Sequence, residues 1–127
     1  MKLLSDKGAS GVSYEGIYFK LNSNINLNNK QWTPIRNFAG NFNGGGNSIT
    51  DLRITNYNDD YVGLFGNMKT GSVSNLNVSG YIKTERSYVG MICGGATGDV
   101  KFENISVTGT VAGSSIVGGL LGLINRF

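Results

Sequence analysis

The sequence holds few side chains of the kinds that enzymes use for catalysis. Histidine is absent and the only cysteine is Cys93. This removes the Ser-His and Cys-His nucleophile pairs and the commonest ligand of transition metals. Cys93 ends an apolar run and is expected to be a core or turn residue. The sequence therefore predicts no catalytic residue, no cofactor and no metal ligand.

Carboxylates are the remaining candidates for acid–base chemistry, because glycoside hydrolysis needs two carboxyl groups roughly 5 to 9 Å apart. Asp59 and Asp60 are adjacent and are expected to form a surface turn, with weak calcium binding as the alternative. Positions one repeat apart carry Asp60 with Ser87 and Ser74 with Glu103. Neither pair supplies two carboxylates, so we expect a protein that is not an enzyme.

Three aromatic residues are the candidates for contact with a ligand: Trp32, Tyr61 and Tyr88. The two tyrosines occupy equivalent positions of a repeat. They would stack as an exposed pair suited to sugar rings or to a protein partner. The alternative is that they pack over a corner of the fold. The partners expected from this interpretation are a glycan or a host or surface protein.

The composition favours tight turns between short strands. The chain has 127 residues, with 20 glycines, 16 asparagines and one proline. Glycine and asparagine are poor helix formers, so long helices are not expected. The net charge of +3 comes from residues scattered along the chain, which predicts no nucleic-acid partner. No apolar run has the length of a membrane span.

An internal repeat gives the strongest indication of the fold. Its three copies are YVGLFG at 61–66, YVGMICG at 88–94 and IVGGLLG at 116–122. Their closing glycines, Gly66, Gly94 and Gly122, are evenly spaced along the chain. A second block at residues 73–80 recurs at 102–109, and an earlier copy is assigned to residues 49–54.

Each block alternates apolar with polar residues, which is typical of a strand with one buried face. A unit of this length with two or three short strands is one coil of a solenoid, because stacked coils bury an apolar face that a single coil cannot. We therefore expect an all-β fold, a parallel β-helix of four to five short coils. Residues 1–127 would form one domain, with an N-terminal cap at 1–16 and repeats at 17–127.

The repeat also predicts which residues stack. The expected inward ladders are Leu52, Leu76 and Ile105; Ile54, Val78 and Val107; and Leu64, Ile92 and Leu120. Asn77 and Ser106 should point outward. Asn75 and Asn104 are equivalent, and Asn tolerates left-handed backbone, so their amides either stack between coils or start a strand with a local turn. Residues 44–46, all glycine, should turn a tight corner with positive φ.

Several stretches together resemble the GLUG repeat of bacterial surface proteins. They are VGLFG at 62–66, VSNLNVSG at 73–80, the opening strands at 14–27, WTPI at 32–35 and FAGNFNGGGNSI at 38–49. The resemblance covers about residues 10–127 and implies a right-handed parallel β-helix. Proteins with this repeat include adhesin-like surface proteins and the non-catalytic N-terminal region of immunoglobulin A-cleaving peptidases.

The chain departs from the family pattern at positions where the family carries aspartate, histidine or glycine. These positions are Asn24, Asn26, Arg36, Asn43 and Asn47. Amide side chains do not act as acids or bases, so a metal or acid–base role for the asparagine positions is weakened.

The resemblance and the repeat together favour a non-catalytic structural or binding module of a bacterial cell-surface or secreted protein, either an adhesin-like stalk or a ligand-binding face. The alternatives are a fragment of a polysaccharide-active β-helix enzyme and a phage-tail or assembly component. Because a fresh repeat has just begun where the sequence ends, we expect a fragment that self-associates through its last coil, residues 116–124. The expected location is extracellular or at the cell surface, with the signal peptide absent from this chain.

Overall fold

The structure is a computed structural model that describes residues 13–55, 57–119 and 121–124. All paired strands in this part of the chain run parallel. The larger sheet contains β1 (Tyr18–Lys20), β2 (Ile25–Asn26), β3 (Asn41–Asn43), β4 (Ser48–Ile54), β6 (Gly71–Lys83) and β8 (Val100–Ala112). The smaller sheet contains β5 (Phe65–Met68), β7 (Cys93–Ala96) and β9 (Leu121–Ile124).

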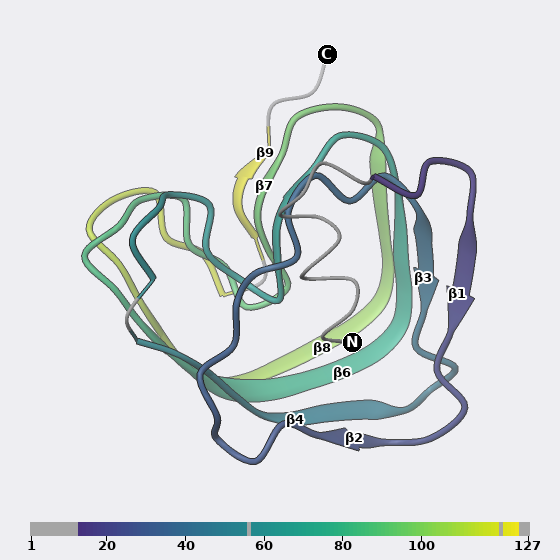
Figure 1. The fold of residues 1–127 in the computed structure, drawn as a ribbon, viewed down its shortest axis with the longest axis horizontal. Helices are drawn as coiled ribbons and strands as arrows, with labels where there is room; N and C mark the ends of the chain where they lie inside the picture. Colours follow the sequence, from purple (N-terminus) through teal and green to yellow (C-terminus); the bar gives the residue numbers. More distant parts are fainter. Residues whose placement is uncertain (1–12, 56, 120, 125–127) are drawn as a thin grey trace.

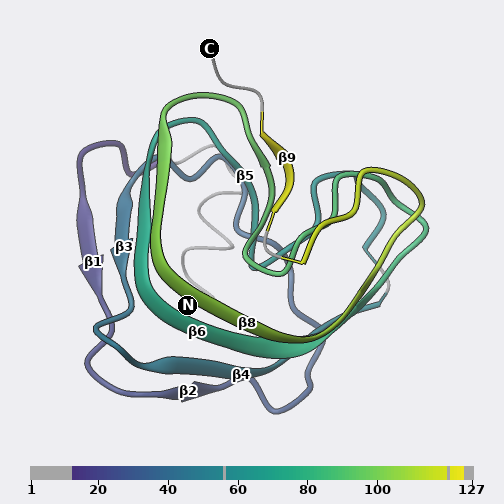
Figure 2. The same ribbon diagram turned by 180° about the vertical axis from the view of Figure 1, so that it is seen from behind.

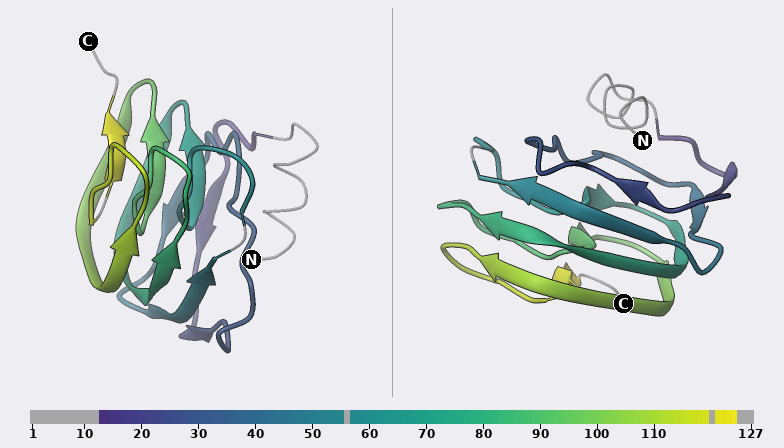
Figure 3. Two further views of the ribbon diagram at one scale, coloured as in Figure 1. Left: turned by 90° about the vertical axis from the view of Figure 1, so that its left-hand side faces the viewer. Right: turned by 90° about the horizontal axis from the view of Figure 1, so that it is seen from below.

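Equivalent strands of successive repeats lie next to one another, and each turn of the chain around the fold is called a pass. Tyr18 pairs with Asn41, Asn41 with Ser72, and Ser72 with Lys101. The four passes of the described residues begin at β1, β3, β6 and β8, and they lie as successive layers (Figure 3). Parallel pairing of this kind follows from the repeat, because equivalent strands run in the same direction.

The larger sheet curls through a corner, so that it forms a half-barrel around the smaller sheet (Figures 1 and 2). β6 pairs with β3 over residues 72–74 and with β4 over residues 77–82. Asn75 lies between these two stretches with a φ of 52°, and the equivalent Asn104 of β8 has a φ of 54°. A single left-handed residue therefore bends each long strand at the same point.

The preceding pass makes this corner with a loop instead of a single residue. β3 ends at Asn43 and β4 begins at Ser48, with the glycines between them. Gly45 and Gly46 have φ angles of 63° and 81°, as predicted for a tight corner. Glycine adopts this region without steric cost.

The core lies between the curled sheet and the smaller sheet as one hydrophobic cluster. Phe42 of the larger sheet meets Phe65 of the smaller sheet with ring centroids 5.6 Å apart, and Phe38 lies 5.0 Å from the same ring. Leu76 and Ile82 are fully buried. This burial is the main stabilising term of the fold.

The predicted pairing of the two long strands is confirmed. Leu76 pairs with Ile105 and Val78 with Val107. Asn77 and Ser106 are exposed. Leu76 is fully buried, whereas Ile105 of the fourth pass is only partly buried.

The predicted ladders are wrong for the second pass. Leu52 pairs with Gly80 instead of Leu76, and Ile54 pairs with Ile82 instead of Val78. The register shifts between Ile49 and Leu52, where Asp51 has a positive φ of 58°. The blocks at 49–54 and 73–78 resemble each other because both contain a residue with left-handed backbone directly before a leucine. They are not equivalent in the fold, since Leu52 pairs with Gly80 and not with Leu76.

The remaining predictions concern the smaller sheet and the N-terminus. Cys93 pairs with Phe65 and with Leu121, as the repeat predicts. Leu64 and Ile92 of the third ladder are both fully buried, whereas Leu120 and most of the expected cap at 1–16 lie outside the described residues. Within the described ranges no helix is long and apolar enough to cross a membrane.

Candidate functional site

Three stacked loops, residues 57–64, 84–92 and 113–119, include Tyr61 and Tyr88, two of the three candidate contact residues. Val62 bridges to Val89, and Val89 to Val117. The loops are further joined by backbone hydrogen bonds such as that from Tyr61 N–H to the Ser87 carbonyl, at 3.1 Å. Figure 1 shows them side by side, away from the curled sheet.

Tyr61 and Tyr88 stack against each other, which is one part of the two arrangements considered from the sequence. Their ring centroids are 4.8 Å apart and the planes differ by 12°. Both tyrosines are half-buried and have positive φ angles, 67° and 61°. A non-glycine residue in this region costs about 1–3 kcal/mol, so the surrounding loops must hold it there.

Ile116 continues this row and was missed from the sequence. It precedes Val117 as Tyr88 precedes Val89, it has the same positive φ, 54°, and its side chain is 46% exposed. Alignment of the repeat copies that begin at 61, 88 and 116 could have identified this position. It was overlooked because the third copy has isoleucine where the first two have tyrosine. The row of Tyr61, Tyr88 and Ile116 is called the stacked row.

A row of polar groups precedes the stacked row by one residue. The Ser87 backbone N–H donates to Oδ1 of Asp60 at 2.8 Å, and the hydroxyls of Ser87 and Ser115 are 2.8 Å apart. Asp60 is therefore used to join two loops. This arrangement confirms that Asp60 and Ser87 are equivalent.

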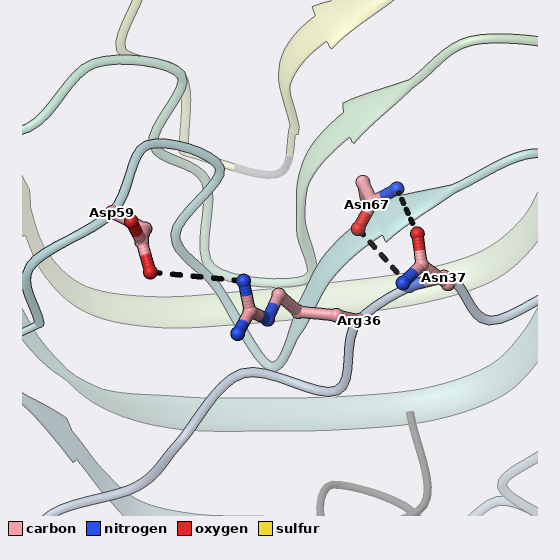
Figure 4. A network of polar contacts seen from close by, with 4 residues as sticks. All are labelled: Arg36, Asn37, Asp59 and Asn67. Carbon is pink, nitrogen blue, oxygen red and sulfur yellow. Dashed lines mark hydrogen bonds and ion pairs between the residues drawn. The ribbon is translucent and has the colours of Figure 1, made fainter. Parts of the chain in front are cut away.

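The other carboxylate of the predicted turn, Asp59, pairs with Arg36 at 3.6 Å, and the side chains are 63% and 39% exposed (Figure 4). An exposed pair of this kind contributes little to stability. Burial raises the pKa of the neighbouring Tyr57 phenol above its usual value, Arg36 opposes this shift, and Asp59 adds to it. Within the described residues no group of three or more cysteine, aspartate or glutamate side chains could hold a metal ion.

The Arg36 segment is also held on its other side. Asn67 Oδ1 accepts from the Asn37 backbone N–H at 3.0 Å, and its amide donates to Asn37 Oδ1 at 3.2 Å (Figure 4). Nε of Arg36 and the hydroxyl of Tyr57 are buried and have no hydrogen-bond partner among residues 13–55, 57–119 and 121–124. A buried water molecule is the usual partner of such atoms.

An open hollow of about 760 Å³ lies beside the same loops. Its lining residues are Thr55, Tyr57, Asn58, Lys83, Thr84, Glu85 and Arg86. Hydroxyl, amide and both signs of charge meet there, so the hollow offers hydrogen bonds to a polar ligand and few apolar contacts.

Trp32, the third candidate for ligand contact, lies in the core, and so does Cys93, which was expected to be a core or turn residue. Trp32 is 8% exposed, and its indole N–H donates to the Leu64 carbonyl at 3.1 Å. Its ring therefore offers no exposed face to a ligand. Cys93 is fully buried, and burial raises the pKa of its thiol to about 12. A thiol with so high a pKa is not a nucleophile near neutral pH.

The carboxylate of Glu103 is the remaining predicted candidate. Ser74 pairs with Glu103, as the repeat predicts, and Glu103 lies 3.2 Å from Lys101 on the exposed face of β8. Asp59, Asp60 and Glu103 thus each have a partner that is not a second carboxylate. The arrangement suits contact through rings and hydrogen bonds.

Comparison with known proteins finds distant similarity to two long proteins. The chain is 37% identical over 86 residues to halomucin of Haloquadratum walsbyi, an alignment that covers 67% of the chain and 1% of halomucin. It is 35% identical over 107 residues to a putative Gly-rich membrane protein of Evansella cellulosilytica, covering 73% of the chain and 12% of that protein. No family model matches the chain. No solved structure matches it either.

Proposed function

We propose that the chain is part of a non-catalytic structural module of a cell-surface or secreted protein, built as a right-handed parallel β-helix of GLUG-type repeats. The observation that carries the proposal is the in-register parallel stacking of four passes, in which Leu76 pairs with Ile105 and Val78 with Val107. A protein of this design grows by adding similar passes, and its length is set by their number.

The similar proteins support the location. One is named halomucin and the other a putative Gly-rich membrane protein, and the chain spans only 1% and 12% of their lengths. We infer that this chain is likewise a small part of a long protein, in which it serves as a stalk or spacer that carries other parts away from the cell.

The side-chain chemistry supports a role without catalysis. Asp60 joins two loops, Asp59 pairs with Arg36 and Cys93 is buried with a raised pKa. A polysaccharide-active enzyme needs two carboxyl groups across one bond. The partners of Asp59, Asp60 and Glu103 are groups of other kinds.

Labelling of intact cells tests the location. Antibodies against the folded chain should label unpermeabilised cells of the source organism, and brief treatment of intact cells with protease should remove the signal. A cytoplasmic protein used as a control should be labelled only after permeabilisation. Labelling of this chain only after permeabilisation would contradict the proposal.

A turnover screen tests the absence of catalysis. The chain, incubated with a panel of polysaccharides and peptides, should release products at the rate of the buffer alone. Turnover that disappears in Asp60→Asn or Glu103→Gln would support the enzyme alternative instead.

A further inference from the structure

The outer edge of β8 lacks a neighbouring strand among the described residues. β6 pairs with β3 and β4 on one side and with β8 on the other, whereas β8 pairs only with β6. In Figure 3, β8 lies at the end of the stack of layers. A long, free strand edge presents a row of backbone donors and acceptors to which another strand can pair.

Burial differs between equivalent residues of the third and fourth passes. Val89 is fully buried, but Val117, its partner one pass later, is 42% exposed. Leu76 is fully buried, but Ile105 is only partly buried. The same holds for Phe102, Val107 and Val111, which are partly buried and pair with the buried Val73, Val78 and Ile82. The fourth pass therefore exposes apolar surface that one added pass would cover.

The hydrogen bonds between the asparagine side chains at the corner all run in the same direction along the stack. The amide of Asn75 donates to Oδ1 of Asn43 at 3.3 Å, and the amide of Asn104 donates to Oδ1 of Asn75 at 3.0 Å. Each amide thus donates to the preceding pass. Oδ1 of Asn104 has no partner within the described ranges, so an added pass must bring a donor to this corner.

Glycine occupies equivalent positions in β6 and β8. Gly80 pairs with Gly109. A Cβ atom placed on Gly80 would lie 2.4 Å from the Leu52 carbonyl oxygen, and one placed on Gly109 would lie 2.0 Å from that of Gly80. A residue stacked on Gly109 in the same way must also lack a side chain.

We infer that the free edge of β8 is a docking surface for one further parallel pass of this same repeat, with an amide donor over Asn104 and a glycine over Gly109. The inference rests on the proposed function, since a repeating module is what supplies such a pass. The continuous pairing of β6 with β8 over residues 71–83 and 100–112 defines its register. The added strand hydrogen-bonds to β8 and covers the apolar side chains beside it.

The spacing of the repeat gives the point at which this pass should be attached. Ile124 pairs with Ala96, and β8 begins four residues after Ala96. An added pass should therefore start four residues after Ile124, directly behind Phe127. A copy of residues 71–98 attached there places its Asn75 over Asn104 and its Gly80 over Gly109.

Hydrogen exchange of the extended chain tests the inference. We expect the edge amides of β8, which point away from β6, to exchange about tenfold or more slowly than in the 127-residue chain, because they gain a partner strand. Amides of β3 serve as the internal reference, since they already lie between two strands. The melting temperature should rise, and sedimentation should show a monomer.

Two matched extensions serve as controls. In one the order of the appended residues is scrambled, and in the other the appended copy alone carries Asn75→Ala with Gly80→Val. Both should give β8 little added protection. Equal protection by the scrambled extension, unchanged exchange in the native extension, or edge amides of β8 already protected in the unextended chain would each overturn the inference. Labelling of intact cells does not depend on a fifth pass, so the proposed function and this inference can fail separately.

Discussion

The side-chain amide of Asn104 donates to Oδ1 of Asn75 at 3.0 Å across 29 residues of sequence. Both residues have left-handed backbone, with φ angles of 54° and 52°. One residue type thus meets two demands, because asparagine tolerates this conformation and its amide can both donate and accept. The asparagines bend the sheet and join successive passes at the same corner.

Substitutions of Asn75 should separate these two roles. Asn75→Gly keeps the left-handed backbone and loses the side-chain bonds, which should lower the free energy of unfolding by about 1 kcal/mol. Asn75→Ala also meets the steric cost of the left-handed region and should lose about 2 kcal/mol or more. Urea denaturation measures both. A loss in Asn75→Ala no larger than that in Asn75→Gly would show that backbone strain at this corner is unimportant.

The two members of the Leu76–Ile105 pair should differ in their sensitivity to truncation. Leu76→Ala creates a cavity in a fully buried site and should cost about 2–5 kcal/mol, whereas the partly buried Ile105→Ala should cost less. Leu76→Asp should prevent folding, because it buries an unpaired charge. Circular dichroism during denaturation provides the measurement. A cooperatively folded Leu76→Asp protein would contradict this register.

Three glycines allow steric contact and backbone strain to be compared. Gly109 has a φ of 121°, and a Cβ atom on it would lie 2.0 Å from a carbonyl oxygen. Gly46 has a φ of 81°, but a Cβ atom on it would meet no other atom within 4 Å. Gly119 has neither a positive φ nor a close neighbour. Substitution by alanine should destabilise the chain most at Gly109, by about 1 kcal/mol at Gly46, and by less than that at Gly119. Melting temperatures of the three variants test the order. A Gly109→Ala protein as stable as Gly119→Ala would show that the passes can separate easily.

Cys93 should react with thiol reagents only when the chain unfolds. Burial raises its pKa from the usual 9.0 to about 12, so the native thiol stays protonated where the unfolded thiol ionises. The contribution of this group to stability is fully present below pH 9 and is lost as the pH rises from 9 to 12. Denaturation at several pH values should show this decline, and Cys93→Ala should remove that part of it. Fast labelling of the native chain at pH 8 would mean that Cys93 is accessible.

The stacked tyrosines should carry any contact with sugar rings. If a glycan binds this face, Tyr61→Ala and Tyr88→Ala should each weaken binding by about tenfold or more, because a ring contact is lost. Tyr18→Ala is the matched control, since Tyr18 is 81% exposed on β1 and lies outside the stacked row. A glycan array followed by calorimetry on the best ligand provides the measurement. Equal losses in all three variants would place the contact elsewhere.

The sequence by itself determined the parallel pairing of the repeated strands. Matching patterns at regular spacing placed Leu76 with Ile105, and Cys93 with Phe65 and Leu121. Copies of one pattern that run in the same direction bury the same face only when equivalent residues stack, so the register follows from the repeat. The equivalence of Tyr61 and Tyr88 followed for the same reason, whereas the structure was needed to show that their rings stack.

Only the tertiary structure decided how the second pass fits this repeat and which aromatic residues reach the surface. Residues 49–54 match the pattern around Asn75, but Leu52 lies opposite Gly80, because a left-handed residue before a leucine is a local bend that occurs at more than one point of the circuit. Trp32 is buried, and the Leu64 carbonyl, 32 residues away in the sequence, accepts its indole N–H. Such contacts depend on the path of the chain between repeats, and the local pattern of residues does not encode that path.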